Sequence, residues 1–433
     1  MNERNFAIKT IEKIKDGGYA SELMDKIPGE LNYSLVRQLV YGVVENDILL
    51  EWTIKQYLKN PNKKIPSLVD SILKLGIYQN FYLDSIPKYA IVNEALKSCE
   101  YFKMEGFKGF VNSLLRNTDK NYIHNRISKL PSVHDRLKLT YSVGNDFYSF
   151  LLKGYKVKTI RKILESYSEV PEMVIRINGL KGSKADLINE LEPLSFQLEE
   201  IDFLDNGLIV KNPKGLFDTE LFKNGLFTVQ GGGSILTSLF LDPKLNCNIL
   251  DICAAPGGKT CHISDLTNNT GKVLANDLYS HKIAKIQENA KRLGCTNIEY
   301  SNFDAKIFQK ELINTFDYIL LDAPCSGAGI VGKKPEIKIR RTTKEINTLI
   351  ETQRSIMSNC IKYLKIGGYI IYSTCSIFKE ENENQREYFL KNHKNIESSP
   401  FEYKNNSVSY LSLMPYEKGT DGFFISKYKK TSN

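Results

Sequence analysis

Two of the eight cysteines in this 433-residue chain stand where they could do chemistry. Cys325 ends the run Asp322-Ala-Pro-Cys325, and Cys375 ends the run Ser373-Thr374-Cys375; each run lies at the end of an apolar stretch typical of a strand. A thiolate can form a covalent intermediate with a substrate, but a thiol of pKa ~8.5 ionises readily only in an electropositive or helix-terminal setting. Cys375 precedes a predicted helix. The alternative is that both are buried core thiols, although an aspartate and a proline beside Cys325 are unusual choices for packing.

A glycine-rich segment, residues 251–260 (DICAAPGGKT), is predicted to be a cofactor loop. Its two glycines let the backbone approach a ligand, and the helix that follows favours negative charge at its N-terminus. The spacing is neither GxGxxG nor GxxxxGK[ST], which argues against dinucleotide and phosphate-cradling loops. Asp277 follows about 20 residues later, where an acid can take both ribose hydroxyls of an adenosine-containing cofactor. The alternative for Asp277 is helix capping; Asp304 is similarly placed to reach an adenine amino group.

The elements that must position these residues alternate between apolar strands and amphipathic helices. This order predicts an α/β fold with a doubly wound, mostly parallel sheet, in which ligands bind beyond the carboxyl ends of the strands. If the fourth and fifth strands are neighbours, the two thiols face one pocket. The strands are expected at residues 248–252, 272–276, 297–301, 317–322 and 369–374, and one helix is expected at 280–294 with Ile283, Ile286, Ala290 and Leu293 on one face.

Changes along the chain in the spacing of apolar residues and in the positions of turn residues predict three domains. Residues 1–135 are predicted to be all-helical, residues 136–235 to form a small α+β linker domain, and residues 236–433 to form the catalytic domain. Glycines 231–233 are expected to be a flexible break between the last two. Helical faces are indicated by Leu68, Ile72 and Leu75 and by Val92, Leu96 and Cys99, and linker strands are expected at 207–210 and 226–229.

Composition narrows the class of protein. Hydrophobic residues make up 42% and charged residues 25%, as expected for a folded globular chain. An apolar run of the roughly 20 residues that span a bilayer is absent, as is a signal-peptide core, so we expect a cytoplasmic protein. The cysteines show neither CxxC pairs nor zinc-ligand spacing, which argues against disulfides and metal. The net charge is +9, and residues 51–150 carry 15 Lys and Arg against nine Asp and Glu, which suits a polyanionic partner.

Three segments together resemble the family of RNA 5-methylcytosine methyltransferases: DICAAPGGKT, LDAPCSGAG and YSTCSIFKEENE. FTVQGGGS and GTDGFFISKYKK also look like motifs of this family, and the similarity extends over nearly the whole chain. Upstream, KLGIYQ, IVNEALK and FVNSLLRN resemble the NusB-like RNA-binding domain of the branch that acts on small-subunit ribosomal RNA. The resemblance implies a Rossmann-like class I S-adenosylmethionine methyltransferase domain behind the NusB-like and linker domains. It also implies methylation of carbon 5 of cytosine 967 in 16S rRNA through a covalent cysteine–C6 adduct.

The resemblance also implies roles for single residues. Cys375 would be the nucleophile, Cys325 would assist breakdown of the adduct, and Asp322 and Lys259 would complete the catalytic site. The residues alone leave the order of the thiols open, because DNA-type cytosine methyltransferases use a Pro-Cys cysteine, the position of Cys325. The implied S-adenosylmethionine site consists of Cys253, Ala254, Ala255, Pro256, Gly257, Gly258, Lys259, Asp277, Asp304 and Asp322.

RNA contacts are implied in two places. Arg176 and Asn178 resemble the R-x-N element of the family's linker domain, and a basic run follows Cys325. The run departs from the family pattern at Gly332 and Ile339, which puts details of RNA contact in doubt, and its alternative role is a solvated helix start. The expected RNA-binding residues are Arg176, Asn178, Lys333, Lys334, Lys338, Arg340 and Arg341. The expected partner is 16S rRNA, free or partly assembled, bound by a monomer without metal or membrane.

Two other functions use the same architecture. A nucleotide-dependent oxidoreductase fits the sheet, but the missing GxGxxG and the paired cysteines count against it. A non-catalytic RNA-binding factor could keep the scaffold, but Asp322, Cys325 and Cys375 are all present.

Overall fold

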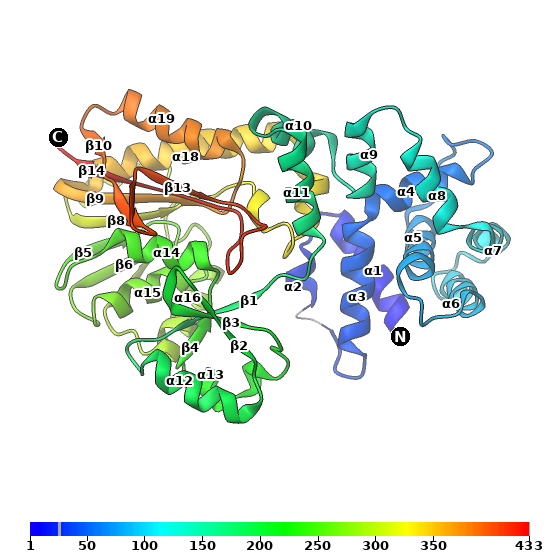
Figure 1. Ribbon diagram of the computed structural model, residues 1–433, viewed down its shortest axis with the longest axis horizontal. Helices are drawn as coiled ribbons and strands as arrows, with labels where there is room; N and C mark the ends of the chain where they lie inside the picture. Colours follow the sequence, from blue (N-terminus) through cyan, green and yellow to red (C-terminus); the bar gives the residue numbers. More distant parts are fainter. Residues whose placement is uncertain (25–26, 433) are drawn as a thin grey trace. The chain divides into compact units, whose positions relative to one another are not determined.

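Helices form the whole N-terminal part of the chain in the computed structural model, which describes residues 1–24 and 27–432. They continue past residue 135, where the sequence texture changes, as far as Tyr167, so the predicted linker domain begins with helices (Figure 1). The helices are α1 (Glu3–Lys15), α2 (Ala20–Met24), α3 (Tyr33–Glu45), α4 (Asp47–Gln56), α5 (Ser67–Tyr82), α6 (Lys88–Tyr101), α7 (Lys108–Asn117), α8 (Lys120–Ser128), α9 (Val133–Thr140), α10 (Asn145–Gly154) and α11 (Val157–Tyr167).

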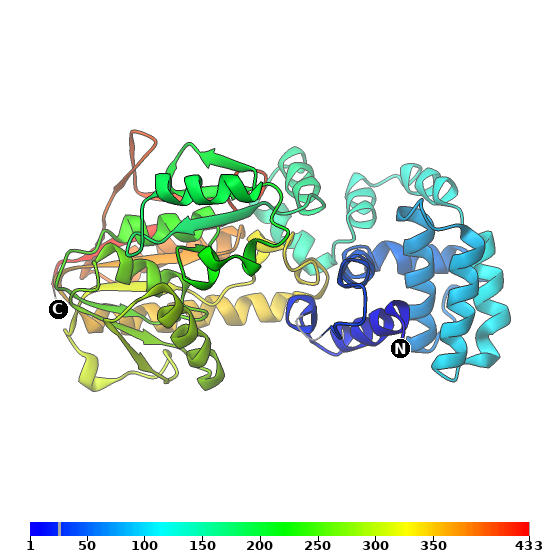
Figure 2. The ribbon, with the colours of Figure 1, turned by 90° about the horizontal axis from the view of Figure 1, so that it is seen from below.

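The apolar faces of the first eight helices share one core. Figure 2 shows these helices in blue and cyan. The expected faces of α5 and α6 are confirmed, because Ile72, Leu75, Val92 and Cys99 are buried in this core. The side chain that would be added at Gly42 on α3 would overlap the ring of Tyr78 on α5, which explains a glycine in the middle of a helix. Burial of this continuous apolar stripe is what stabilises the helical part.

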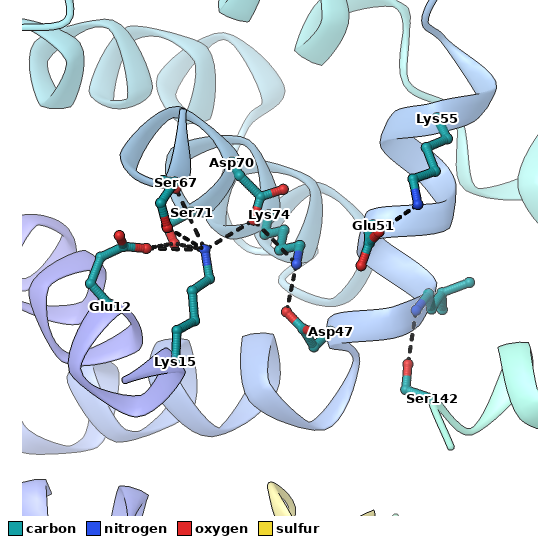
Figure 3. Close-up of polar contacts among 11 residues, drawn as sticks. Glu12, Lys15, Asp47, Glu51, Lys55, Ser67, Asp70, Ser71, Lys74 and Ser142 are labelled. Carbon is teal, nitrogen blue, oxygen red and sulfur yellow. Dashed lines mark hydrogen bonds and ion pairs between the residues drawn. The ribbon is translucent and has the colours of Figure 1, made fainter. Parts of the chain in front are cut away.

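A polar cluster joins α1, α4 and α5 beside that core (Figure 3). The Lys74 ammonium lies 2.7 Å from Asp47 and 3.2 Å from Asp70, and Lys15 lies 3.0 Å from Asp70 and from Glu12. Burial lowers the pKa of Lys74, but the carboxylates of Asp47 and Asp70 outweigh it and leave that pKa above its ordinary value. The cluster therefore keeps a nearly buried lysine charged and ties three helices together.

A four-stranded antiparallel sheet follows in the order β2-β3-β1-β4. The linker strand expected at 207–210 is the C-terminal half of β3, and the strand expected at 226–229 is β4. The elements are β1 (Met173–Ile177), α12 (Lys184–Leu191), β2 (Leu198–Ile201), β3 (Leu204–Val210), α13 (Glu220–Lys223) and β4 (Phe227–Val229).

The predicted doubly wound sheet is confirmed as a mixed, eight-stranded sheet. Its main path is β10-β14-β9-β8-β5-β6-β7, with β13 paired to β14; β9, β8, β5, β6 and β7 are parallel, and β14 is antiparallel to β9. A separate hairpin joins β11 (Phe401–Tyr403) and β12 (Asn406–Val408). The strands are β5 (Asn248–Asp251), β6 (Lys272–Asn276), β7 (Ile298–Ser301), β8 (Phe316–Asp322), β9 (Leu364–Thr374), β10 (Ile396–Ser398), β13 (Tyr410–Leu413) and β14 (Phe423–Lys430).

Alternate residues of the central strands point to opposite faces of this sheet and feed two cores. Leu250, Ile319 and Ile370 pack with Met357 and Cys360 of α18, while Ile249, Leu320 and Ile371 join a second core that includes Ile235 of α14 and Ile263 of α15. The covering helices are α14 (Gly232–Leu241), α15 (Gly258–Leu266), α16 (Ser280–Leu293), α18 (Thr343–Tyr363) and α19 (Glu383–Asn392). Helices on both faces bury the strands and leave their carboxyl ends as the place for a ligand.

The expectation of a flexible break at glycines 231–233 is wrong. Gly232 and Gly233 are the first residues of α14 and are buried. A Cβ atom at Gly233 would lie 2.6 Å from the side chain of Phe423, and one at Gly232 would lie 2.4 Å from the carbonyl oxygen of Gly419. The glycines are there because a helix passes close to β14, a packing reason that composition does not distinguish from flexibility.

The chain divides into two compact units, each continuous in space but not in sequence. One consists of residues 1–169 and 331–342, and includes the short helix α17 (Ile337–Arg340); the other consists of residues 170–330 and 343–433. The three-domain division of the sequence stays a prediction, with the finding that 331–342 groups with the helical residues.

Candidate active site

The two cysteines lie at the ends of adjacent parallel strands. β8 pairs with β9 so that Asp322 lies opposite Ser373, and the Ala323 N–H donates to the Ser373 carbonyl at 2.8 Å. The two loops therefore leave the sheet side by side, and the Sγ atoms of Cys325 and Cys375 lie 3.2 Å apart. The expectation that the fourth and fifth strands are neighbours is confirmed, and both thiols are half-buried at one place.

The two thiols are not equivalent. The hydrogen bond with Cys375 and then burial raise the pKa of Cys325 well above its ordinary value, so this thiol keeps its proton at neutral pH. The helix expected after Cys375 begins only at Glu383, beyond the short turn of 3₁₀ helix at Lys379–Glu381, so Cys375 does not lie at the N-terminus of that helix. The structure thus provides a protonated thiol as hydrogen-bond partner for Cys375 in place of a helix dipole.

An ion pair joins the glycine loop to the cysteine loop. Lys259 Nζ lies 2.6 Å from Asp322 Oδ2, while the Ser373 hydroxyl donates to Asp322 Oδ1 at 2.8 Å. Lys259 also lies over the ring of Phe423, 5.3 Å from its centroid. Asp322, at the end of β8, therefore has a fixed orientation three residues before Cys325.

The predicted cofactor loop, residues 251–260, runs from the last residue of β5 into the first turn of α15 along the same edge of the sheet. Gly257 has a φ of +99°, and a Cβ atom there would also come within 3.1 Å of the backbone of Ile286 on α16. Only glycine meets both conditions without strain. The loop is fastened to the next strand because the Ala254 N–H donates to the Asn276 carbonyl at 2.8 Å.

Asp277 and Asp304 follow the next two strands, β6 and β7. Asp277 is nearly buried; its Oδ2 accepts from the Ala255 N–H at 3.2 Å, and its Oδ1 accepts from the Tyr279 N–H at 3.2 Å. Asp304 is half-buried, with its carboxylate held by the backbone and ammonium of Lys306. Together with Asp251 and Asp322, the last residues of β5 and β8, they make a row of four aspartates at the carboxyl ends of neighbouring strands, the place where an α/β sheet binds its ligand.

Asp251 is the member of this row that sequence reasoning left out. It is the last residue of β5 and is buried, and the Thr260 hydroxyl donates to its Oδ2 at 2.6 Å. Burial raises its pKa to about 7. Its Oδ1 has no hydrogen-bond partner among the described residues, which suits an incoming donor such as the ammonium of an amino-acid-bearing cofactor. The signal was available, since Asp251 ends its strand as Asp322 does.

The linker residues predicted to bind RNA are inside the protein. Arg176 is fully buried; it donates to Gln230 at 2.9 Å and pairs with Asp265 at 2.6 Å. Asn178 donates to the carbonyl oxygens of Gly225 and Leu293 at 2.7 and 2.8 Å. Both therefore hold the four-stranded sheet to α15 and α16, and their burial does not match the expected contact with RNA.

Part of the basic run that follows Cys325 is likewise enclosed by the protein. Lys338 is 1% exposed, and burial lowers its pKa to about 8. Arg340 donates to the carbonyl oxygen of Gly18 at 3.0 Å, and the carboxylate of Glu336 accepts from the Ala20 N–H at 3.1 Å. Lys334 lies over the ring of Tyr19. The burial of Lys338 and the contact of Arg340 with a backbone carbonyl favour a structural role for these two residues over the expected contact with RNA.

Two absences hold for the residues that the structure describes. None of their helices is both long and apolar enough to cross a membrane. No cluster of three His, Cys, Asp or Glu side chains in the same residues has a metal-binding arrangement.

Comparisons with known proteins agree with this fold. A family model described as 16S rRNA methyltransferase RsmB/F matches residues 238–429, and a NusB family model matches residues 1–120. The chain is 31% identical to the probable ribosomal RNA small subunit methyltransferase B of Bacillus subtilis, over 99% of this chain and 98% of that one. It is also 34% identical to a 28S rRNA (cytosine-C(5))-methyltransferase of Mus musculus, over 71% of this chain and 41% of that one.

Two solved structures share the fold. The crystal structure of PH0851 matches with a TM-score of 0.83 at 23% identity, over 99% of both chains. That of NSun6 from Pyrococcus horikoshii with SFG matches with a TM-score of 0.59 at 25% identity, over 67% of this chain and 98% of that one.

The fold and the site together define a Rossmann-like, S-adenosylmethionine-dependent methyltransferase behind a NusB-like helical domain. More particularly, the chain belongs to the ribosomal RNA small subunit methyltransferase B family, whose members methylate carbon 5 of cytosine in rRNA. An oxidoreductase on the same sheet is thereby excluded as the explanation of the glycine loop.

Proposed function

We propose that this protein methylates carbon 5 of cytosine 967 in 16S rRNA through a covalent adduct between Cys375 and carbon 6 of the base. The observation that carries the proposal is the 3.2 Å approach of the Cys325 and Cys375 sulfurs beside the Lys259–Asp322 ion pair. Carbon 5 of cytosine is a poor nucleophile, and addition of a thiolate at carbon 6 converts the ring to an enamine whose carbon 5 is reactive.

The residues divide the reaction among them. As the Cys375 thiolate forms the S–C6 bond, the Asp322 carboxylate relays a proton from the Lys259 ammonium to N3, which neutralises the negative charge that develops on the ring. Lys259 orients Asp322 through their ion pair. S-adenosylmethionine, when bound, supplies the methyl group.

Cys325 then releases the product. As the S–C6 bond breaks, Cys325 passes its proton to the departing Cys375 sulfur and takes the proton from carbon 5, while the N3 proton returns through Asp322 to Lys259. Its raised pKa supports this role, because Cys325 holds a proton when the adduct must be broken. The direct Sγ–Sγ hydrogen bond gives that proton a path.

The loop Cys253–Lys259 would hold S-adenosylmethionine against the ends of β5 and β6. Asp277 would accept from the ribose hydroxyls and Asp304 from the adenine amino group, as their positions after β6 and β7 allow. The free Oδ1 of Asp251 would accept from the ammonium of the methionine part.

The target base must leave the RNA stack to reach the thiols, and the surrounding RNA must be held. The basic excess of residues 51–150 and the remaining basic positions, Lys333, Lys334 and Arg341, are our candidates for phosphate contact. We further propose that the protein acts as a monomer on 16S rRNA that is free or partly assembled, in the cytoplasm where that RNA is made.

Bisulfite mapping of small-subunit rRNA from cells with and without the protein tests the assignment. We expect a single cytosine to lose its mark when the protein is absent, and to regain it with wild-type protein or Cys247→Ala but not with Cys375→Ala. A full complement of marks in cells that lack the protein would refute the rRNA assignment.

A further inference from the structure

A buried carboxylate, Glu381, lies between the two cysteine loops. It belongs to the short turn after β9, and its side chain is fully buried. Its backbone is fixed because the Tyr372 hydroxyl donates to the Glu381 carbonyl at 2.7 Å. No role in the chemistry proposed above uses this residue.

The carboxylate contacts the residue that follows each cysteine. Its Oε1 accepts from the backbone N–H of Ser326 at 2.8 Å, and its Oε2 accepts from the hydroxyls of Ser326 and Ser376 at 2.5 Å each. The two hydroxyls also lie 3.1 Å apart. One side chain therefore joins the backbone just beyond Cys325 to the side chain just beyond Cys375.

A fourth donor extends the connection to α18. Gln353 donates to Glu381 Oε1 at 3.2 Å and to the carbonyl of Pro324, the residue before Cys325, at 3.0 Å. Gln353 is itself held by Gln385 of α19 at 2.8 Å. The loop that carries Cys325 is thus fixed on both sides of the cysteine.

Burial of the Glu381 carboxylate costs free energy, and packing alone does not explain why a carboxylate lies here. Burial raises the pKa of Glu381, and the donors that offset its desolvation are one backbone N–H, two hydroxyls and one amide, all neutral groups. An apolar side chain would fill the space at a lower cost. What an apolar side chain cannot do is hold two separate loops by hydrogen bonds that have defined directions.

We propose that Glu381 is a positioning residue that holds the Cys325 and Cys375 loops together, so that the two thiols stay within hydrogen-bond distance for adduct breakdown. This inference rests on the proposed function for its catalytic meaning. Its geometric content, the distance between the two sulfurs, can be tested without RNA or cofactor.

The first measurement is therefore the rate at which diamide oxidises the two thiols to a Cys325–Cys375 disulfide, followed by peptide mass spectrometry. Wild-type protein should form this disulfide readily. Glu381→Ala should form it at least tenfold more slowly, because a displacement of about 1 Å is enough to lose a reactive geometry. Equal rates in the two proteins, or no disulfide in the wild type, would overturn the proposal.

The second measurement is methyl transfer to a 16S rRNA fragment. Glu381→Ala should lower kcat by about tenfold or more and leave the dissociation constant of S-adenosylmethionine within about twofold, since the cofactor loop is not touched. Glu381→Gln should recover both rates to within about threefold of wild type, because a glutamine can accept from Ser326 N–H and donate to both hydroxyls. If Glu381→Gln is as slow as Glu381→Ala, the negative charge of Glu381 matters and its hydrogen bonds do not. That result would reject the positioning role.

Controls separate the outcomes. Glu387→Gln, on the exposed side of α19, should change neither rate. Ser376→Ala removes one of the four donors to Glu381 and should slow disulfide formation, so the proposal can be tested even if Glu381→Ala does not fold. An unchanged rate in Ser376→Ala would also count against the proposal. If wild-type protein forms the disulfide but methylates no RNA, the proposed function fails while the positioning result stands.

Discussion

Lys259 Nζ lies 2.6 Å from Asp322 Oδ2, and this ion pair connects the first turn of α15 with the end of β8. Because the Ser373 hydroxyl donates to the other oxygen of Asp322, two residues hold this carboxylate at the end of β8: Lys259 from α15 and Ser373 from β9. The glycine-rich segment 251–260 and the strand ends that precede Cys325 and Cys375 are thereby fixed relative to one another.

Replacing Lys259 by methionine should lower kcat by about 10²-fold, because Asp322 loses the partner that orients it at the base. The affinity for RNA should change little, since Lys259 is mostly buried. Single-turnover methylation with a 16S rRNA fragment measures the change. Lys285→Met, an exposed lysine on α16, is the matched control and should behave as wild type.

Alanine variants of the two cysteines should behave differently on denaturing gels. Cys325→Ala should accumulate a covalent protein–RNA adduct, because the proton that releases Cys375 is missing, whereas Cys375→Ala should form none. Cys247→Ala, outside the site, should give the wild-type pattern. Adduct with Cys375→Ala and none with Cys325→Ala would exchange the two roles.

Asp251→Asn should weaken S-adenosylmethionine binding by at least about tenfold, because a buried acceptor loses its charge. In the cofactor-free protein the same change should be stabilising at higher pH. The folded pKa of Asp251, about 7, lies above the unfolded value near 3.9, so the folded state binds the extra proton and wild-type stability falls as pH rises between these values. Urea unfolding should show the variant gaining roughly 1.4 kcal/mol per pH unit within that window and nothing further above it. A difference that is flat from pH 4 to 8 would mean that Asp251 titrates normally.

Gly233→Ala should destabilise the protein by about 1–3 kcal/mol, since the added methyl group would overlap the side chain of Phe423. Gly109→Ala, on α7, has no atom within 4 Å of the added Cβ and should be neutral or slightly stabilising. Thermal unfolding of both variants gives the comparison. Equal melting temperatures would restore the idea that the glycines serve flexibility.

The central sheet and the pairing of Cys325 with Cys375 could be predicted because strands, glycine turns and helices each have a strong local pattern. β6 begins and ends at the predicted residues 272 and 276, and the other four predicted strands overlap the observed ones. Local patterns also identified Asp277 and Asp322, since a residue that ends a parallel strand lies at the ligand edge whatever its neighbours are.

Burial of charged residues could not be predicted in this way. Arg176 and Lys338 have the residue types of an RNA surface, yet each is enclosed by segments far away in the sequence, Asp265 in one case and the N-terminal helices in the other. The same holds for Glu381, whose partners Ser326 and Gln353 meet it only in the folded chain. A single sequence records residue type and spacing, and neither reports which distant side chain supplies a counter-charge.

Residues 331–342 group with the helical unit, while the chain on both sides of them belongs to the other unit. The polypeptide therefore crosses between the units three times, and no single cut separates them. A fragment that starts at Val170 would leave Lys338 without the burial it has here and Glu336 and Arg340 without their partners at Ala20 and Gly18. The helical unit therefore cannot be removed from this chain by a cut at one boundary without also removing the residues that contact segment 331–342.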